Sequence, residues 1–317
     1  MLMLSFFDYQ TLNSNSTRIY FGSIVMLIAV FFIGTKIRGT VGWIGVGNFH
    51  IQPVEIVKIT MIVFLASFLS KKKNELSIFV RVAVSIILVG VPVALILKQP
   101  DFGSSAVIVG TWIIMLLVSR VNKKNLFFLG VFFVTVVFVS SFFMRDYQRE
   151  RLINFVNPYN DPRGSGYNVI QSIVAVGSGG LWGKGLGHGS QSQLNFLPEK
   201  HTDFIFAVVV EELGLFGALA VIFLFGVLLY RIKEIARLSR DNFGYLMAVG
   251  IMTMIFIQTG VNIGMNVGLV PVAGVPLPIM SYGGSSLVSV FLGIGIIQSI
   301  YIRKENPQAF LNMDRGG

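Results

Sequence analysis

Cysteine is absent from this chain, which excludes disulfide bonds, thiolate metal sites and cysteine nucleophiles. Charged residues are scarce at 13% of 317 residues, whereas an average soluble domain carries about a quarter. No nucleotide-binding P-loop is complete, because Ser178 and Gly185 replace residues that the motif requires. The three histidines, His50, His188 and His201, lack the spacing of metal ligands. These absences argue against a P-loop enzyme and against a histidine metal site.

Apolar side chains, in contrast, are abundant: they make up 54% of the chain, and its mean hydropathy is +0.74. They come in blocks rather than at amphipathic spacing, which is the pattern of helices that cross a membrane. The net charge of +10 would suggest nucleic acid as a partner of a soluble protein. Here the basic residues cluster between apolar blocks, as in cytoplasmic loops. We therefore expect an all-α, polytopic membrane helical bundle that does not bind nucleic acid.

A membrane-spanning helix needs about 20 largely apolar residues, and the sequence predicts about eight of them. The predicted spans are 19–35, 54–70, 80–98, 103–120, 125–144, 204–230, 243–266 and 284–302. The last two lie in one charge-free stretch that the proline-containing string "VPVAGVPLPIMSYGG" interrupts. We expect a single integral membrane domain over residues 1–317.

The distribution of lysine and arginine predicts the orientation of these helices. One set of short loops holds Lys71, Lys72, Lys73, Arg120, Lys123, Lys124, Arg231, Lys233, Arg237 and Arg240. The alternate short loops hold only Lys36, Arg38 and Lys98. The first set is therefore predicted to be cytoplasmic, together with both termini. Residues 145–203 then form a large extracytoplasmic loop, whose amphipathic string "YNVIQSIVAVG" favours a lid on the membrane surface.

An acid stands at the edge of a predicted span in the string "PEKHTDFIF", residues 198–206. Asp203 can act as a general base if it lies near a substrate hydroxyl. It can equally be part of the N-cap of the helix that follows. Further along this helix, Glu211 falls nearer the face of Asp203 than Glu212 does. Acids inside a membrane are costly, so both are expected either to take part in chemistry or to pair with a basic residue.

Other polar residues also have two interpretations. Glu55 and Lys58, at i and i+3, are predicted to pair with each other, with a polar cavity as the alternative. In "KQPDFGSS", Asp101 is expected to cap a helix, and Lys98 can meet an anionic lipid head group. Ser281 in "SYGGSS" opens the last span, where small residues serve either anion binding or helix packing. Three amide residues on one helical face are expected to form interhelical hydrogen bonds: Gln258, Asn262 and Asn266.

Two classes of protein fit these observations: an enzyme that acts on a lipid-linked substrate at the outer leaflet, and a transporter. Many transporters repeat their first half in their second half, and the sequence shows no such repeat. The polar residues also gather near the outer surface rather than along a path through the bilayer. Both points favour the enzyme.

Longer strings resemble a known family. Residues 266–286, "NVGLVPVAGVPLPIMSYGGSS", are similar to the signature of the SEDS family (shape, elongation, division and sporulation), which includes RodA, FtsW and SpoVE. The strings "GSQSQLNFLPEKHTDFIFAVVVEELG", "RERLINFVNPYNDPRGSGYNVIQSIVAVGSGGLWGKG" and "KQPDFGSS" also resemble this family. The string "QSQLNFLPE" is closer to the RodA branch than to the FtsW branch. The resemblance covers about residues 36–304.

The resemblance implies a peptidoglycan glycosyltransferase of the bacterial cytoplasmic membrane that polymerises lipid II during cell elongation and shape maintenance. Its implied partners are lipid II, membrane lipids and a class B penicillin-binding protein. Asp203 matches the family's essential acid, and Lys98, Arg151 and Lys200 are candidates to bind the pyrophosphate. Glu212 and Ser281 are further candidates for substrate binding. The alternatives are a lipid II flippase and an inactive scaffold of the elongation complex.

No organic cofactor is evident, although the resemblance is compatible with a divalent cation, Mg²⁺ or Mn²⁺. The chain also departs from the family pattern. Ten spans are usual there, and the string "FFDY" at 6–9 resembles the end of the second one. Val54 stands where serine is usual, and Gly42 precedes Trp43 where arginine is frequent. The resemblance therefore implies that the family's first two spans have no counterpart in this sequence, a departure that bears on activity and partner docking. The two substitutions are smaller departures from the family pattern.

Overall fold

The computed structural model describes residues 6–37, 40–46, 49–71, 78–119, 146–161, 165–194 and 196–304. Most of this structure is helical, and six of its helices are long and apolar enough to cross a membrane. A further apolar helix, α5 (Phe102–Val118), is shorter. The expected polytopic helical fold is therefore confirmed. The span predicted at 125–144 lies outside the described residues.

The contacts within the chain group its residues into two compact units. The first consists of Met1–Arg120, Leu228–Ile255 and Ser285–Gly317, and the second of Val121–Val227 and Phe256–Gly284. Two long helices have residues in both units: α10 (Ile205–Arg237) and α11 (Asn242–Asn266). A single domain over the whole chain stays a prediction.

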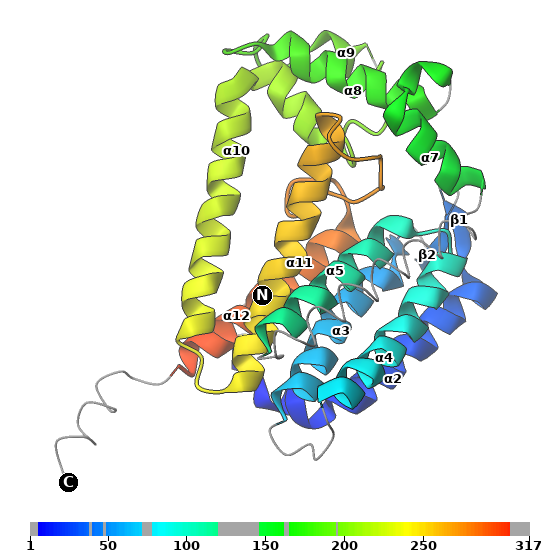
Figure 1. Ribbon diagram of the computed structural model, residues 1–317. Helices are drawn as coiled ribbons and strands as arrows, with labels where there is room; N and C mark the ends of the chain where they lie inside the picture. Colours follow the sequence, from blue (N-terminus) through cyan, green and yellow to red (C-terminus); the bar gives the residue numbers. More distant parts are fainter. Residues whose placement is uncertain are drawn as a thin grey trace, which may run out of the picture. The chain divides into compact units, whose positions relative to one another are not determined.

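The first unit is a bundle of apolar helices (Figure 1). Its helices besides α5 are α2 (Gln10–Ile33), α3 (Pro53–Ser70), α4 (Ile78–Lys98) and most of α12 (Gly284–Ile302). Helix α3 is buried along most of its length, and it packs against α2, α4 and α5. The first part of α11 approaches it at Gly250, where a Cβ would come within 2.5 Å of Ile62. Only glycine permits this close contact.

Helix α2 begins at Gln10 rather than at residue 19, so the predicted start of the first span is wrong. The helical turns before residue 19 carry polar side chains, so a search for apolar runs does not include them in the span. Ser16 donates a hydrogen bond of 2.9 Å to Ser67 of α3, and Ser67 donates one of 2.7 Å to Asn13. Hydrogen bonds between the two helices thus compensate for the low hydropathy of this segment.

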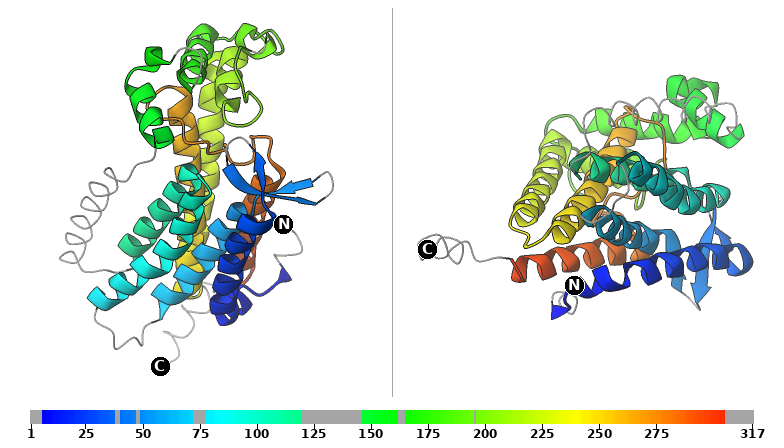
Figure 2. Two further views of the ribbon diagram at one scale, coloured as in Figure 1. Left: turned by 90° about the vertical axis from the view of Figure 1, so that its right-hand side faces the viewer. Right: turned by 60° about the horizontal axis from the view of Figure 1, so that its bottom comes forward.

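A small antiparallel sheet follows α2, and the all-α prediction did not include it. Its strands are β1 (Thr35–Ile37), β2 (Thr40–Val46) and β3 (Phe49–Ile51), in that order. Figure 2 shows the three strands as a short ribbon next to the helices of the first unit. Strands of three to seven residues are too short to alter a hydropathy window of membrane-span length.

The second unit contains the whole of the predicted extracytoplasmic loop, 145–203, and the described part of this loop is largely helical. It comprises α7 (Asp146–Val156), the 3₁₀ turn η1 (Pro158–Asn160), α8 (Ser165–Gly179) and α9 (Ser190–Gln193). Helix α8 contacts α7, η1 and α9. Ala175 of α8 packs with Leu197, Phe204 and Ala207 in a small core. The long loop is therefore folded against the start of α10.

Helix α10 is interrupted at Gly214, where φ is +67° and ψ is −161°. The single helix predicted at 204–230 is thus two helical arms (Figure 1). Residues 180–185 bind the backbone groups around the break: Lys184 N–H donates to the Glu211 carbonyl at 3.0 Å, and Leu215 N–H donates to the Gly180 carbonyl at 2.9 Å. Because residues 180–185 stabilise this break, the sequence around Gly214 alone does not predict it.

Candidate functional site

Asp203 lies in the turn before α10, in the second unit, and its side chain is half-buried. The turn is fixed by hydrogen bonds to three consecutive carbonyl groups. The His201 carbonyl accepts from Tyr282 N–H at 2.7 Å, and the Thr202 carbonyl accepts from Ser281 Oγ at 2.6 Å. The Asp203 carbonyl accepts from the side-chain amides of Asn262 and Asn266, at 2.9 and 3.0 Å. We call this set of bonds the carbonyl clamp.

The two asparagines of the carbonyl clamp also bind other parts of the second unit. Asn262 Nδ2 donates to the Val275 carbonyl at 2.8 Å, and Asn266 Oδ1 accepts from Ala207 N–H at 3.0 Å. Both side chains are fully buried. The two asparagines of the predicted polar face therefore connect α11, the start of α10 and the loop that follows α11. Satisfied amides in this position hold the backbone rigid. The prediction is wrong for Gln258, whose buried side-chain amide has no hydrogen-bond partner within the described residues.

The loop at 267–283 borders the side chain of Asp203. A Cβ at Gly274, where φ is +67°, would lie 3.9 Å from Asp203 Oδ2. Arg151 of α7 donates a hydrogen bond of 3.2 Å to the Val272 carbonyl in the same loop. Lys200 precedes the turn, and its Nζ donates to the Ser192 carbonyl at 2.6 Å. The structure thus brings Asp203, Arg151 and Lys200 into one unit.

Ser281, predicted to bind substrate, holds the loop instead. Its hydroxyl donates to the Thr202 carbonyl and accepts from Leu277 N–H at 2.7 Å, and the residue is buried. These contacts account for the serine without a ligand. Its role in substrate binding stays a prediction, as does the choice between general base and helix cap for Asp203, two residues before α10 begins.

Glu211 and Glu212 have different surroundings. Glu211 is fully buried, and its carboxylate accepts from Lys184 Nζ at 2.9 Å, Gln191 N–H at 2.9 Å and Ser192 N–H at 3.1 Å. Glu211 therefore pairs with a basic residue and fixes the first turn of α9. Glu212 is half-buried and receives a long hydrogen bond of 3.5 Å from Ser192 Oγ. Its role in substrate binding stays a prediction.

Four of the predicted residues, Glu55, Lys58, Lys98 and Asp101, belong to the first unit. Lys58 Nζ and Glu55 Oε1 form a buried ion pair of 2.7 Å, as predicted, and Ser289 of α12 donates to the other oxygen of Glu55 at 3.0 Å. Asp101 caps α5, as predicted, by accepting from Ser104 N–H at 2.9 Å. Burial is the main cause that raises the pKa of Asp101 above its usual value, and the bond from Ser104 opposes it. Lys98 is exposed at the end of α4.

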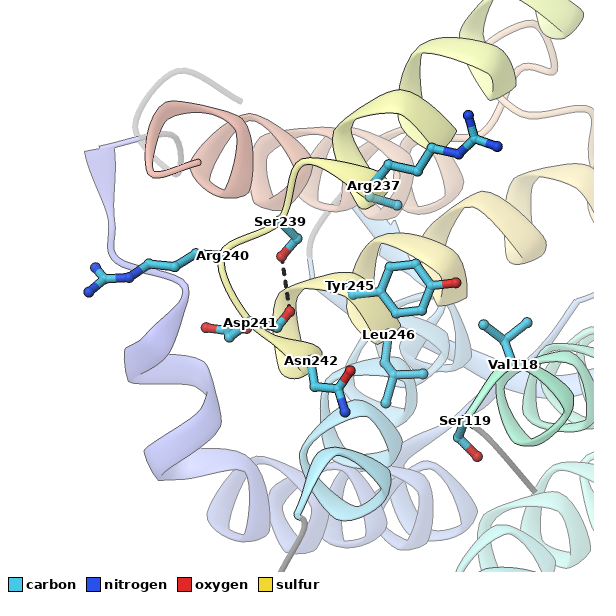
Figure 3. A pocket seen from close by; sticks show the side chains of 10 residues that line it. Val118, Ser119, Arg237, Ser239, Arg240, Asp241, Asn242, Tyr245 and Leu246 are labelled. Carbon is cyan, nitrogen blue, oxygen red and sulfur yellow. Dashed lines mark hydrogen bonds between the residues drawn. The ribbon is translucent and has the colours of Figure 1, made fainter. Parts of the chain in front are cut away.

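A polar cavity of about 500 Å³ lies in the first unit where α10 is followed by α11 (Figure 3). Its acid, Asp241, accepts hydrogen bonds from Tyr9 Oη at 2.9 Å and from Gly244 N–H at 2.6 Å. Burial and this acid raise the pKa of Tyr9 to about 12. The carboxylate is thus occupied by contacts that fix the turn, and the cavity adds no reactive group to the candidate site.

The sequence pointed to Asp203, Arg151 and Lys200 as candidates but not to several residues that hold the backbone around Asp203 and Val272. Tyr282 and Gly274 were not singled out, and the contact of Arg151 with Val272 joins residues more than 100 positions apart. A glycine between prolines is the signal that marks Gly274 as a special backbone position. The carbonyl clamp has no local signal, because its donors follow the turn by about 60 to 80 residues.

Fold and site together define a polytopic helical membrane protein with an acid on a rigid turn beside a helical loop. The chain belongs to the FtsW/RodA/SpoVE family: the family model, described as a cell cycle protein, matches residues 1–306. This assignment confirms the family that the sequence strings resemble.

Three known proteins illustrate the similarity. The peptidoglycan glycosyltransferase MrdB of Escherichia coli K12 is 40% identical over 288 residues, which is 90% of this chain and 78% of MrdB. A chain from a peptidoglycan synthase complex, studied for the coordination of polymerisation and crosslinking, matches with a TM-score of 0.80 at 29% identity. That match covers 95% of this chain and 84% of the other. The crystal structure of RodA from Thermus thermophilus matches with a TM-score of 0.70 at 26% identity, covering 96% and 83%.

Proposed function

We propose that this chain is a peptidoglycan glycosyltransferase that polymerises lipid II during cell elongation and shape maintenance. Family membership supports the reaction, as does the similarity to MrdB, a protein named for the same activity. The observation that carries the proposal is the position of Asp203. Its backbone is fixed by the carbonyl clamp, and its half-buried carboxylate borders the family-signature loop at Gly274.

In the proposed reaction, Asp203 is the general base. The 4-hydroxyl of the acceptor sugar attacks C1 of the donor sugar, its proton passes to Asp203, and the bond from C1 to the undecaprenyl pyrophosphate breaks. General-base catalysis contributes about 10²- to 10⁴-fold when the base is correctly positioned. Because the clamp fixes the backbone on both sides of Asp203, little conformational freedom is left to lose in the transition state.

Positive charge is needed where the pyrophosphate develops negative charge. In the unit of Asp203, Arg151 and Lys200 are the proposed sources. Arg151 donates to the Val272 carbonyl and Lys200 to the Ser192 carbonyl, and both side chains are positively charged and carry several N–H donors. Lys98 belongs to the first unit, and its role in substrate binding stays a prediction from the sequence.

The described part of the chain gathers no group of three His, Asp or Glu residues that could hold a metal ion. Asp203, Arg151 and Lys200 supply the base and the positive charge in this proposal.

We place the site at the outer face of the bacterial cytoplasmic membrane, with both termini in the cytoplasm. The loop charges support this orientation, because lysine and arginine are concentrated in the set of short loops that is predicted to be cytoplasmic and are few in the other set. We also propose a class B penicillin-binding protein as the partner. The similarity to a chain of a peptidoglycan synthase complex supports a partner that crosslinks the glycan strands.

The test is polymerisation of lipid II by the purified chain together with its transpeptidase partner. Asp203→Asn should lower the rate by about 10²-fold or more, while the thermal unfolding temperature stays near that of the wild type. Glu234→Gln, which removes a partly exposed acid that pairs with Arg237, is the matched control and should leave the rate unchanged.

Normal polymerisation by Asp203→Asn would show that the base is assigned wrongly. A folded wild-type chain that makes no glycan strands, but moves labelled lipid II across liposome bilayers, would contradict the enzymatic proposal and favour a flippase.

A further inference from the structure

An exposed apolar patch lies in the loop between α8 and α9. Leu181, Trp182 and Leu186 are 59%, 79% and 71% exposed. Trp182 packs against Phe216 of α10, with ring centroids 4.7 Å apart, and Phe216 is itself largely exposed. Several large apolar side chains that cluster and remain exposed indicate a contact surface. We call residues 181–186 the apolar turn.

The apolar turn has a fixed backbone. Gly183 N–H donates to the Gly179 carbonyl at 2.8 Å, and Gly185 N–H donates to the Glu212 carbonyl at 3.0 Å. Lys184 adds the ion pair with the buried Glu211. A Cβ at Gly183 would come within 2.2 Å of the Glu212 carbonyl oxygen, so only glycine fits there. The exposed side chains are therefore presented in one arrangement on α10.

The second arm of α10 continues this apolar surface. Residues 215–237 reach about 34 Å at 1.5 Å per residue, which is enough to cross the hydrocarbon core of a bilayer. Phe216, Leu219 and Phe223 lie at helical spacing on this arm, and all three are largely exposed. Trp182 packs on Phe216 at the start of the arm, so it lies at the end of an exposed apolar surface. Tryptophan is enriched at this level, where the membrane meets water.

We propose that the apolar turn inserts Leu181, Trp182 and Leu186 into the interfacial layer of the membrane, beside the start of the second arm of α10. Its partner is lipid, because the patch is continuous with the surface of a candidate membrane span. The turn thereby anchors the loop that carries α8 and α9. The same backbone bonds that fix the turn to Glu211 and Glu212 transmit this anchorage to α10.

The absence of cysteine makes a direct test available, because a single introduced cysteine can be spin-labelled without background. The full chain carrying Leu186→Cys or Trp182→Cys is placed in phosphatidylethanolamine–phosphatidylglycerol nanodiscs. Electron paramagnetic resonance then compares the accessibility of the label to oxygen, which partitions into lipid, and to a nickel chelate, which stays in water. Phe223→Cys on the second arm is the lipid control, and the exposed, charged Arg240→Cys is the aqueous control.

The expected ratio of oxygen to nickel accessibility at positions 182 and 186 lies between those of the two controls. A ratio equal to that of Arg240→Cys would place the turn in water and overturn the proposal. So would low accessibility to both reagents, since another protein segment would then cover the patch. Leu186→Cys keeps the test valid if replacing Trp182 disturbs its packing on Phe216.

Discussion

At the level of single residues, Asp203 and Glu211 are two acids of one unit with different burial and different hydrogen bonds. The carboxylate of Glu211 is fully buried and accepts three short hydrogen bonds that hold Lys184 and the first turn of α9. Around Asp203 the backbone carbonyls are held, and the carboxylate is half-buried beside Gly274. These bonds give Glu211 a structural role, whereas the border with Gly274 in the family-signature loop supports Asp203 as the proposed base.

The carbonyl clamp should be essential for the position of Asp203. Asn262→Leu removes the donor to the half-buried Asp203 carbonyl and to the buried Val275 carbonyl, and leaves each with one bond fewer. We expect a loss of about 1–3 kcal/mol in the free energy of unfolding and a lower polymerisation rate. Thermal unfolding in detergent and the lipid II assay measure the two effects.

Gln258 provides a control on the same face of α11. It is fully buried, and its side-chain oxygen and nitrogen have no hydrogen-bond partner within the described part of the chain. Gln258→Leu removes an uncompensated polar group, so its stability should be equal to or above that of the wild type. If Gln258→Leu and Asn262→Leu lose stability and activity equally, the clamp has no special role.

Asp101 should make stability depend on pH. Burial raises the folded-state pKa of Asp101 above the usual 3.8. At pH values between 3.8 and this raised pKa, the folded chain therefore binds more protons than the unfolded chain. Stability is therefore lost as the pH rises through this window. Asp101→Asn keeps a capping side chain but cannot ionise. Its unfolding temperature relative to the wild type should increase from pH 4 to pH 8; a difference that stays constant would contradict this assignment.

At the level of elements, α10 shows what a local pattern can and cannot predict. Its apolar composition was sufficient to predict a span from 204, and α11 and α12 were predicted within one residue of their observed bounds. The break at Gly214 was not predicted, since glycine is common in membrane helices. What makes the break stable is the backbone of residues 180–185, about 30 positions earlier in the chain.

Gly214 should tolerate no side chain. Its φ and ψ fall in a region open almost only to glycine, and a Cβ would come within 2.4 Å of Gly183 N and the Leu181 carbonyl oxygen. Gly214→Ala should therefore cost more than about 2 kcal/mol. Gly226→Ala, in the same helix with no atom near its Cβ, should change stability by at most about 1 kcal/mol. Thermal unfolding of the two variants side by side measures the difference.

At the level of the whole molecule, hydropathy predicted the membrane class because a bilayer requires long apolar helices whose backbone is fully hydrogen-bonded. It could not predict the sheet at 35–51 or the polar start of α2, where hydrogen bonds to Ser67 replace apolar burial. Nor could it reveal the grouping of the candidate residues into two units. The contacts between Cα atoms place Asp203 in the second unit. They place three other candidates, Lys98, Glu55 and Lys58, in the first unit, which the sequence alone does not indicate.

The proposed orientation rests on the charges of the loops, and it predicts on which side of the membrane Asp203 lies. Gln193 of α9 is exposed in the predicted outer loop, and Arg240 is exposed in the turn between α10 and α11. In spheroplasts, a membrane-impermeant maleimide should label Gln193→Cys at once and Arg240→Cys only after permeabilisation, with the cysteine-free wild type as the blank. The reverse pattern would place Asp203 on the cytoplasmic side, where the polymerisation of an outward-facing lipid-linked substrate is impossible.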